Sequence, residues 1–279
     1  MYHKSYKKKF DNIFIFILLY YYINIIMIKH NLHRFKPIIT TNSGSIIKTS
    51  TNCVSKVFYN KTNYKNELYI LSKLQHPNII KIKKHYEDEY KKGVIEFKYY
   101  EDGDLLSFIN KHTRTKNTNV SNKQRLHIFN TIAHTLLYCH QNNIVHGDIK
   151  PDNFLLEHHT PIMSDFGLSI YNKDFYNPLE KNMVFRLGKQ GSDGYIAPEV
   201  QDNYIGPCSD VYSLGIVLYQ LFLNEYPHFN NDVLELNFNE KNKCFPYKVC
   251  NLLHEMLHVD YKQRPTLEEI IMEYDIENI

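Results

Sequence analysis

Four polar residues that lie close together in the sequence could carry out chemistry on a phosphate group. Asp148, Lys150 and Asn153 fall in one short run, and Asp165 follows it. Phosphoryl transfer needs a carboxylate to accept the proton of the attacking hydroxyl, oxygen ligands for Mg²⁺, and positive charge near the phosphates. Asp148 can supply the base and Lys150 the charge. Asn153 and Asp165 carry the oxygen atoms that Mg²⁺ prefers, so we interpret them as metal ligands.

The residues around this set form three longer motifs. They read HGDIKPDN (146–153), DFG (165–167) and APE (197–199). In this order and spacing they resemble the catalytic part of the eukaryotic-type serine/threonine protein kinases, and the resemblance extends from about Ile38 to the C-terminus. It implies an enzyme that transfers the γ-phosphate of ATP to serine and threonine hydroxyls of protein substrates, with Mg²⁺ as its metal ion.

Two charged residues in the first third of the chain match the same family. Lys56, in the run CVSKV, stands where the family has a strand lysine, and Glu67 stands where the family has the carboxylate that pairs with it. The resemblance implies that Lys56 contacts the phosphates of ATP. A long lysine side chain loses rotamer entropy when it is immobilised, so a partner such as Glu67 is expected to hold it.

The resemblance also implies an adenine pocket with a hinge behind it. Its residues are Ile46 and Val54 above the base, Leu155 below it, Phe97 at the back, and Lys98 to Tyr100 as the hinge. Apolar residues line pockets and cores alike, so ordinary core positions stay open for Val54 and Leu155. Lys98 replaces a residue that is commonly acidic, which need not matter because the hinge binds through its backbone.

The loop that covers the phosphates departs from the family pattern. Gly44 remains, whereas Ile39 and Thr41 stand where two earlier glycines belong. Glycine permits positive φ angles and a close backbone approach, and β-branched residues do not. This degenerate loop predicts a looser nucleotide grip and supports the main alternative, a pseudokinase that binds or scaffolds without transfer.

A second alternative is a small-molecule phosphotransferase of the aminoglycoside or choline kinase type. Such enzymes also carry HGD followed by an asparagine and a metal-binding aspartate. They generally lack a lysine at the position of Lys150, and they lack the APE segment with its arginine partner. The resemblance implies that Arg264 pairs with Glu199 and that Asp210 braces the catalytic loop, which favours the protein kinases.

Hydrophobic patterning predicts an α+β fold with two lobes. Residues 35–59, 80–86 and 94–99 alternate or are rich in β-branched residues, which is typical of a small antiparallel sheet. A helical period follows at residues 66–74. After Gly103 helical patterns predominate, at residues 105–109, 125–140, 211–223, 248–257 and 267–274. We therefore expect the bilobal protein-kinase fold over residues 35–279, with an N-lobe of one sheet and one helix to about residue 100 and a mainly helical C-lobe over 101–279.

Residues 1–34 form an N-terminal extension outside this domain. Three lysines at 7–9 precede an apolar stretch at 13–28, an order found in signal sequences and anchors. The stretch is short for a spanning helix, which needs about 20 apolar residues. It is a candidate membrane anchor, with a packed extra helix or translation from Met27 as the alternatives.

The net charge and the number of cysteines limit which partners and which compartment are expected. The 33 basic and 30 acidic residues give a net charge of +3, which argues against nucleic acid as a partner. The five cysteines are odd in number and form no CxxC pair, so a reducing compartment is the simpler interpretation. We expect a cytoplasmic monomer that acts on proteins. Frequent Asn, Ile and Lys suggest an A+T-rich genome, such as that of a large DNA virus or a protist.

Five positions bear on substrate choice. Lys150 and Ser192 match residues that accompany Ser/Thr acceptors in the family. Asp104 and Asp152 match carboxylates that bind arginines upstream of the acceptor in basophilic kinases, whereas Gln220 replaces a third such carboxylate. A mild preference for basic residues follows.

One position bears on regulation. Gly147 stands where most family members have an arginine that receives a phosphate on the activation segment. We expect activity that does not depend on phosphorylation of that segment, which contains Ser169, Tyr171, Tyr176 and Ser192.

Overall fold

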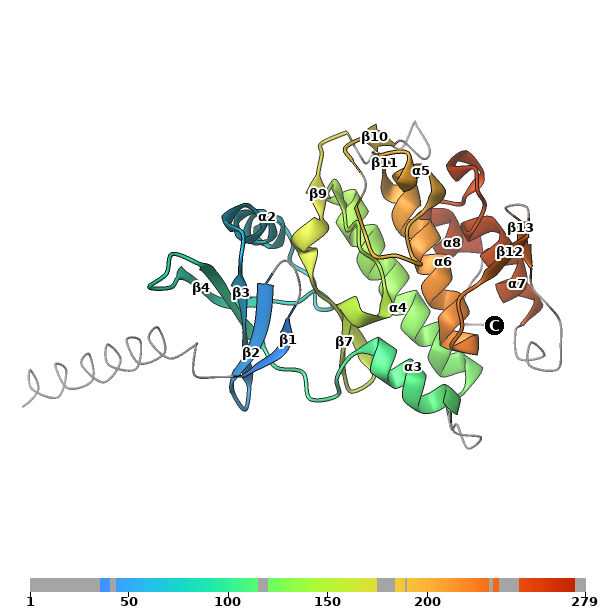
Figure 1. Cartoon of the computed structure of the whole chain (residues 1–279). Coiled ribbons are helices and arrows are strands. Elements are labelled where there is room, and N and C mark those ends of the chain that lie inside the picture. The colour runs from blue at the N-terminus through green and yellow to red at the C-terminus, as the bar shows by residue number, and fades with distance from the viewer. Residues whose placement is uncertain are drawn as a thin grey trace, which may run out of the picture. The chain divides into compact units, whose positions relative to one another are not determined.

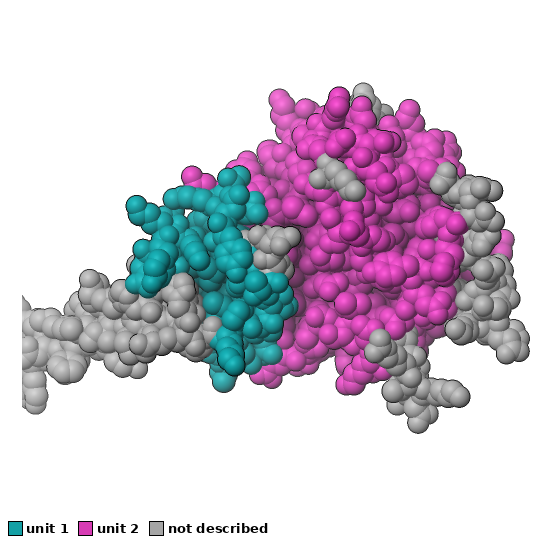
Figure 2. Space-filling view, in the orientation of Figure 1, with its two compact units in different colours: residues 1–64, 82–99 teal, residues 65–81, 100–279 magenta. Residues whose placement is uncertain are grey.

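The computed structural model describes residues 36–40, 44–114, 120–174, 184–188, 190–230, 233–235 and 246–273. The chain divides into two compact units (Figure 2). The sheet unit contains residues 1–64 and 82–99, and the helical unit contains residues 65–81 and 100–279. The candidate anchor at 13–28 lies outside the described residues, and within the described part no helix is long and apolar enough to cross a bilayer.

The sheet unit is built on one antiparallel sheet of five strands. Their order across the sheet is β1-β2-β3-β5-β4 (Figure 1). The strands are β1 (Pro37–Thr40), β2 (Gly44–Ser50), β3 (Cys53–Phe58), β4 (Ile82–Glu87) and β5 (Gly93–Lys98). Because side chains alternate between the two faces of a strand, one face gathers the apolar cluster of Ile47, Val57 and Val94. The predicted sheet is confirmed.

Helix α2 (Lys61–Ser72) follows β3, and the boundary between the units falls inside it. Asn60 begins the helix because its side-chain oxygen accepts a hydrogen bond from the backbone N–H of Thr62 at 2.7 Å. Ile70, Leu71 and Leu74 are buried, which accounts for the helical period in the sequence.

The helical unit is organised around two long helices. Its helices are α3 (Leu105–Arg114), α4 (Asn122–Gln141), α5 (Pro198–Gln201), α6 (Pro207–Leu223), α7 (Tyr247–Met256) and α8 (Leu267–Glu273). Helix α4 packs against α6 and α8, and α6 also packs against α7 (Figure 1). A reciprocal capping box between Ser121 and Gln124 starts α4. Pro207 starts α6 and Asn224, in the left-handed conformation, ends it.

Short antiparallel strand pairs in the helical unit were not predicted. They are β6 (Ile144–Val145) with β9 (Ile170–Tyr171), β7 (Phe154–Glu157) with β8 (Thr160–Met163), β10 (Phe185–Arg186) with β11 (Tyr204–Ile205), and β12 (His228–Asn230) with β13 (Val233–Glu235). Segments of two to four residues are too short to show a hydrophobic period. The α+β class and all predicted helices are confirmed, and these pairs are additions to them.

A buried ion pair holds the start of α5 to the segment between α7 and α8. The Arg264 guanidinium donates to both carboxylate oxygens of Glu199 at 2.8 Å, and Arg264 is fully buried. It also donates to the backbone carbonyls of His258 and Cys208. The predicted pair is confirmed. Burial, and next the Glu199 carboxylate, raises the pKa of the Cys208 thiol to about 12, so this thiol stays protonated.

We predict that Arg264→Met lowers the free energy of unfolding by about 3–5 kcal/mol, because Glu199 is left as an unpaired buried charge. Chemical denaturation monitored by circular dichroism measures it. The exposed Lys262→Met serves as the control and should change stability by less than about 0.5 kcal/mol. Adding Glu199→Gln to Arg264→Met should restore part of the loss, and equal stability of the two single variants would contradict the prediction.

Candidate active site

The loop that carries the predicted catalytic residues is braced by one buried carboxylate. Asp210, on α6, is 1% exposed. It accepts hydrogen bonds from the backbone N–H groups of His146 at 2.8 Å and Gly147 at 2.9 Å. His140 Nε2, at the end of α4, lies 2.9 Å from Asp210 Oδ2, the oxygen that also accepts from His146. The predicted bracing role of Asp210 is confirmed.

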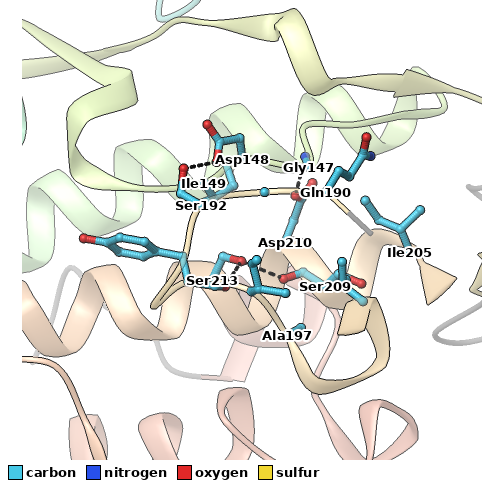
Figure 3. Close-up of a pocket in the computed structure, with 14 residues that line it drawn as sticks. Gly147, Asp148, Ile149, Gln190, Ser192, Ala197, Ile205, Ser209, Asp210 and Ser213 are labelled. Atoms are coloured by element: carbon cyan, nitrogen blue, oxygen red, sulfur yellow. Dashed lines mark hydrogen bonds between the residues drawn. The ribbon is translucent and has the colours of Figure 1, made fainter. Parts of the chain in front are cut away.

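The Asp148 carboxylate lies between two partners from different segments. Ser192 Oγ donates to Asp148 Oδ1 at 2.7 Å (Figure 3). Lys150 Nζ lies 3.0 Å from Asp148 Oδ2 and donates to Ser192 Oγ at 2.5 Å. These three side chains therefore form a closed ring of hydrogen bonds that joins the catalytic loop to the segment before α5. The contact between Lys150 and Asp148 and the bridging hydroxyl of Ser192 were not predicted from the sequence.

Asn153 is tied to the same carboxylate. Its Nδ2 donates to the backbone oxygen of Asp148 at 2.7 Å and to Asp148 Oδ2 at 3.0 Å. Its own backbone oxygen accepts from the backbone N–H and the hydroxyl of Ser164. With its nitrogen engaged in this way, the amide oxygen is the atom that could bind a metal ion.

His146 connects the loop to the segment that contains Asp165. Its Nδ1 accepts from the backbone N–H of Asp148 at 3.3 Å, and its Nε2 lies 3.1 Å from the backbone oxygen of Ser164. This pattern requires the neutral tautomer with the proton on Nε2. The ring also packs against Phe166 with centroids 4.9 Å apart, and both side chains are fully buried.

Asp165 has an unusual backbone conformation. Its φ is +58° and its ψ is +69°, in the left-handed region, and its side chain accepts from the backbone N–H of Gly167 at 3.4 Å. Aspartate tolerates this region better than most residues do, and such conformations concentrate at functional sites. Ser169, 2% exposed, then donates to the backbone oxygen of His146 at 2.9 Å, which returns the segment to the catalytic loop.

Helix α2 holds the segment after Asp165 through residues that the sequence analysis missed. Asn66 Nδ2 donates to the backbone oxygens of Gly167 at 3.3 Å and Ser169 at 3.0 Å. About two helical turns further along, just past the end of α2, Lys73 Nζ lies 4.3 Å from the ring centroid of Tyr171. The predicted residue Glu67, next to Asn66, is 1% exposed. An asparagine in a helix has no sequence signal for such a role.

In the sheet unit, the predicted nucleotide residues share one face of the sheet. Residues that are directly paired across antiparallel strands point to the same face. Ile46 pairs with Lys56, and Val54 pairs with Phe97. Val54 and Lys56 are two residues apart on β3, so all four lie on one face. Lys98 is exposed at the end of β5.

Position 44 requires glycine for a structural reason that was not predicted from the sequence. A Cβ atom at this position would lie 2.3 Å from the backbone oxygen of Val57 on the neighbouring strand. Close packing of β2 on β3 therefore requires glycine here, whatever its relation to phosphate. Ile39 is exposed on β1, and Thr41 lies outside the described residues.

The other predicted residues belong to the helical unit. Tyr100 is half-buried and lies between β5 and α3. Leu155, also half-buried, lies on β7 opposite Ile162 and bridges to Asp104. Asp148, Lys150 and Asn153 are joined by direct hydrogen bonds, as given above.

Gly147 adopts a conformation that favours glycine. Its φ is +77°, and a Cβ atom here would lie 3.0 Å from the backbone oxygen of Leu168. Two of the hydroxyl residues expected on the activation segment, Ser169 and Ser192, are engaged in the hydrogen bonds described above. Tyr171 is 39% exposed, and Tyr176 lies outside the described residues.

Comparison with known proteins identifies the class. Residues 40–274 match the protein kinase domain, and the chain belongs to the protein kinase family. The two units have the composition of its bilobal fold, a small antiparallel sheet and a mainly helical part. Members of this family use ATP and Mg²⁺.

Named relatives point to the serine/threonine branch. The chain is 32% identical over 267 residues to NUAK family SNF1-like kinase 2 of Rattus norvegicus, covering 87% of this chain and 40% of the relative. It is 30% identical over 268 residues to NUAK family SNF1-like kinase 1 of Homo sapiens, covering 87% and 38%. The probable serine/threonine-protein kinase MARK-C of Dictyostelium discoideum is 28% identical over 215 residues, covering 73% and 26%. The chain thus spans about 40% or less of the length of these relatives.

We predict that activity does not depend on phosphate in the activation segment, because position 147 has no side chain to receive it. The protein is treated with a phosphatase, and its initial rate of transfer is measured before autophosphorylation recovers. The rate should stay within about twofold of the untreated protein. A large loss that returns with phosphate on Tyr171 or Tyr176 would contradict this and indicate Lys173 or Arg186, both exposed, as the receptor.

Proposed function

We propose that the protein is a serine/threonine protein kinase that transfers the γ-phosphate of ATP to hydroxyl groups of protein substrates. One observation carries the proposal: Asp148 is held by Ser192, Lys150 and Asn153 in a single hydrogen-bonded group. A buried group of this composition is costly to maintain in a protein that only binds its partners.

Asp148 would accept the proton of the attacking hydroxyl. An ionised carboxylate has about four lone-pair sites, so Asp148 can bind a substrate hydroxyl in addition to its contacts with Ser192, Lys150 and Asn153. The new bond forms between the hydroxyl oxygen and the γ-phosphorus, and the bond from that phosphorus to the ADP oxygen breaks. Lys150 Nζ would balance negative charge on the transferred group, as a preorganised cation does.

Asn153 and Asp165 fit Mg²⁺ because they present an amide oxygen and a carboxylate, which are the ligand atoms that this ion prefers. The metal would neutralise charge on the phosphates. For ATP itself we propose Ile46, Val54, Phe97 and Leu155 around the base, the backbone of residues 98–100 as the hinge, and Lys56, held by Glu67, on the phosphates.

The catalytic domain is proposed to comprise residues 35–279, with the N-lobe ending near residue 100. Residues 1–34 are then an extension, and catalysis does not require the residues before about Met27. The near-neutral net charge of +3 fits a cytoplasmic monomer that acts on proteins, with attachment to membranes through residues 13–28 as the alternative.

A transfer assay with an Asp148 variant tests the function. Asp148→Asn should lower turnover by about two to four orders of magnitude, because the general base is lost. Since Asn keeps the size of the side chain, thermal unfolding should be little changed. Incorporation of labelled phosphate into a general protein substrate and into small aminoglycosides or choline is measured for both proteins.

The outcomes separate the three candidate functions. Transfer to protein by the wild type, lost in the variant, supports the proposal. ATP binding without transfer in both proteins would instead identify a pseudokinase. Transfer to the small molecules alone would identify a small-molecule phosphotransferase.

Substrate choice is proposed to follow two carboxylates. Asp152 is exposed beside Asn153. Asp104 is half-buried and caps α3, because its side chain accepts from the backbone N–H of Ser107 at 2.7 Å. Gln220 is buried and accepts from the Tyr195 hydroxyl at 2.8 Å. Burial raises the pKa of Tyr195, so this hydroxyl keeps its proton and remains the donor.

We predict a mild preference for arginine upstream of the acceptor, because charge-assisted contacts with carboxylates are directional. Asp152→Asn should reduce this preference on a peptide array by about fivefold at most, since exposed ion pairs are weak. Asp104→Asn should act similarly while keeping the helix cap, because asparagine caps helices as well as aspartate does. Asp202→Asn, an exposed change on the same unit, is the control. A preference for acidic residues or proline would contradict the proposal.

A further inference from the structure

One buried polar atom near the catalytic loop has no hydrogen-bond partner among the residues that the structure describes. Gln190 Nε2 is buried and makes no hydrogen bond to any described residue. Most buried polar groups in folded proteins are hydrogen-bonded to protein or to ordered water, so an unpaired amide calls for an explanation. The surrounding groups do not share this condition: Asp148, Ser192 and Asp210 all have protein partners.

A small cavity lies next to this amide. Its volume is about 10 Å³, and its walls include Gly147, Asp148, Gln190, Ser192, Ser209 and Asp210 (Figure 3). A cavity of about 10–15 Å³ can hold one water molecule when two to four polar groups surround it. The size of the cavity and its polar walls both meet this condition.

The side chain of Gln190 occupies the space that a side chain at position 147 would otherwise need. A Cβ atom at position 147 would lie 3.3 Å from Gln190 Nε2 and 3.5 Å from the side chain of Ile205. Figure 3 shows Gln190 beside Gly147. The next residue, Gly191, approaches so closely that a Cβ atom there would lie 3.3 Å from the backbone oxygen of Gly147. Because position 147 has no side chain, the segment at 190–192 packs directly on the catalytic loop.

We propose that Gln190 binds one internal water in this cavity and acts as a positioning residue for the loop at 190–192. The water accepts a hydrogen bond from Gln190 Nε2 and links the loop to the polar walls of the cavity. This link holds Gly191 against Gly147, and thereby holds Ser192 Oγ on Asp148. Neither the water nor the Gln190 amide carries a charge, so this link between the loop at 190–192 and the catalytic loop is uncharged. The test of this proposal by activity rests on the proposed kinase function, whereas the test by the presence of the water does not.

The test uses Gln190→Met, which keeps the length of the side chain and removes its hydrogen-bonding groups. The matched control is Gln141→Met, an exposed glutamine at the end of α4. For Gln190→Met, kcat with a Ser/Thr peptide should fall about tenfold, the effect of one lost hydrogen bond on a positioned group. The KM for ATP should stay within about twofold, because the nucleotide does not contact this loop in the proposal. Gln141→Met should match the wild type.

A crystal structure of the full chain gives the second readout. The wild type should show a water within hydrogen-bonding distance of Gln190 Nε2, and Gln190→Met should lack it. An empty cavity in the wild type would overturn the proposal. So would unchanged kcat together with equal or higher stability in Gln190→Met, the result expected if the amide were merely unpaired. If the wild type transfers no phosphate at all, the proposed function fails, and the crystallographic water still decides this inference.

Discussion

The geometry of the candidate active site depends on the buried carboxylate of Asp210. Between β6 and the short 3-10 helix at Pro151–Asn153 the catalytic loop has no regular structure, so its backbone N–H groups there need partners from elsewhere. Asp210 supplies them to His146 and Gly147 from a helix that is packed on its own neighbours. A buried charge is stable only with such partners. The brace and the loop therefore require each other, and Asp148 is placed by a rigid helix rather than by the loop itself.

Besides Asp210, a few hydrogen bonds hold segments that are distant in the sequence against the catalytic loop. Ser169 returns the segment after Asp165 to His146, and Ser192 ties the segment before α5 to Asp148. Asn66 attaches α2 to the same region. All of these links are hydrogen bonds between side-chain and backbone groups of the chain itself.

The site residues differ in how far the sequence could predict them. Asp148, Lys150 and Asn153 lie in one short motif, so their proximity follows from chain connectivity alone. Ile46, Val54, Lys56 and Phe97 come from three strands, and their shared face follows from strand pairing that the sequence does not display. The single surviving glycine of the degenerate loop was interpreted through phosphate binding. Its close approach to Val57 could be seen only once β2 and β3 were paired.

The sequence by itself determined the fold class, the helices and main strands, and the catalytic motif, because hydrophobic periods and short motifs are local properties of the chain. It also predicted the pairing of Glu199 with Arg264 by resemblance. Only the tertiary structure decided the contacts of Asn66, the two-residue strand pairs, and the position of Gln190 beside Gly147. These features join residues that are far apart along the chain and carry no periodic signal. Their partners are set by how the helices pack, and packing is a property of the folded chain as a whole.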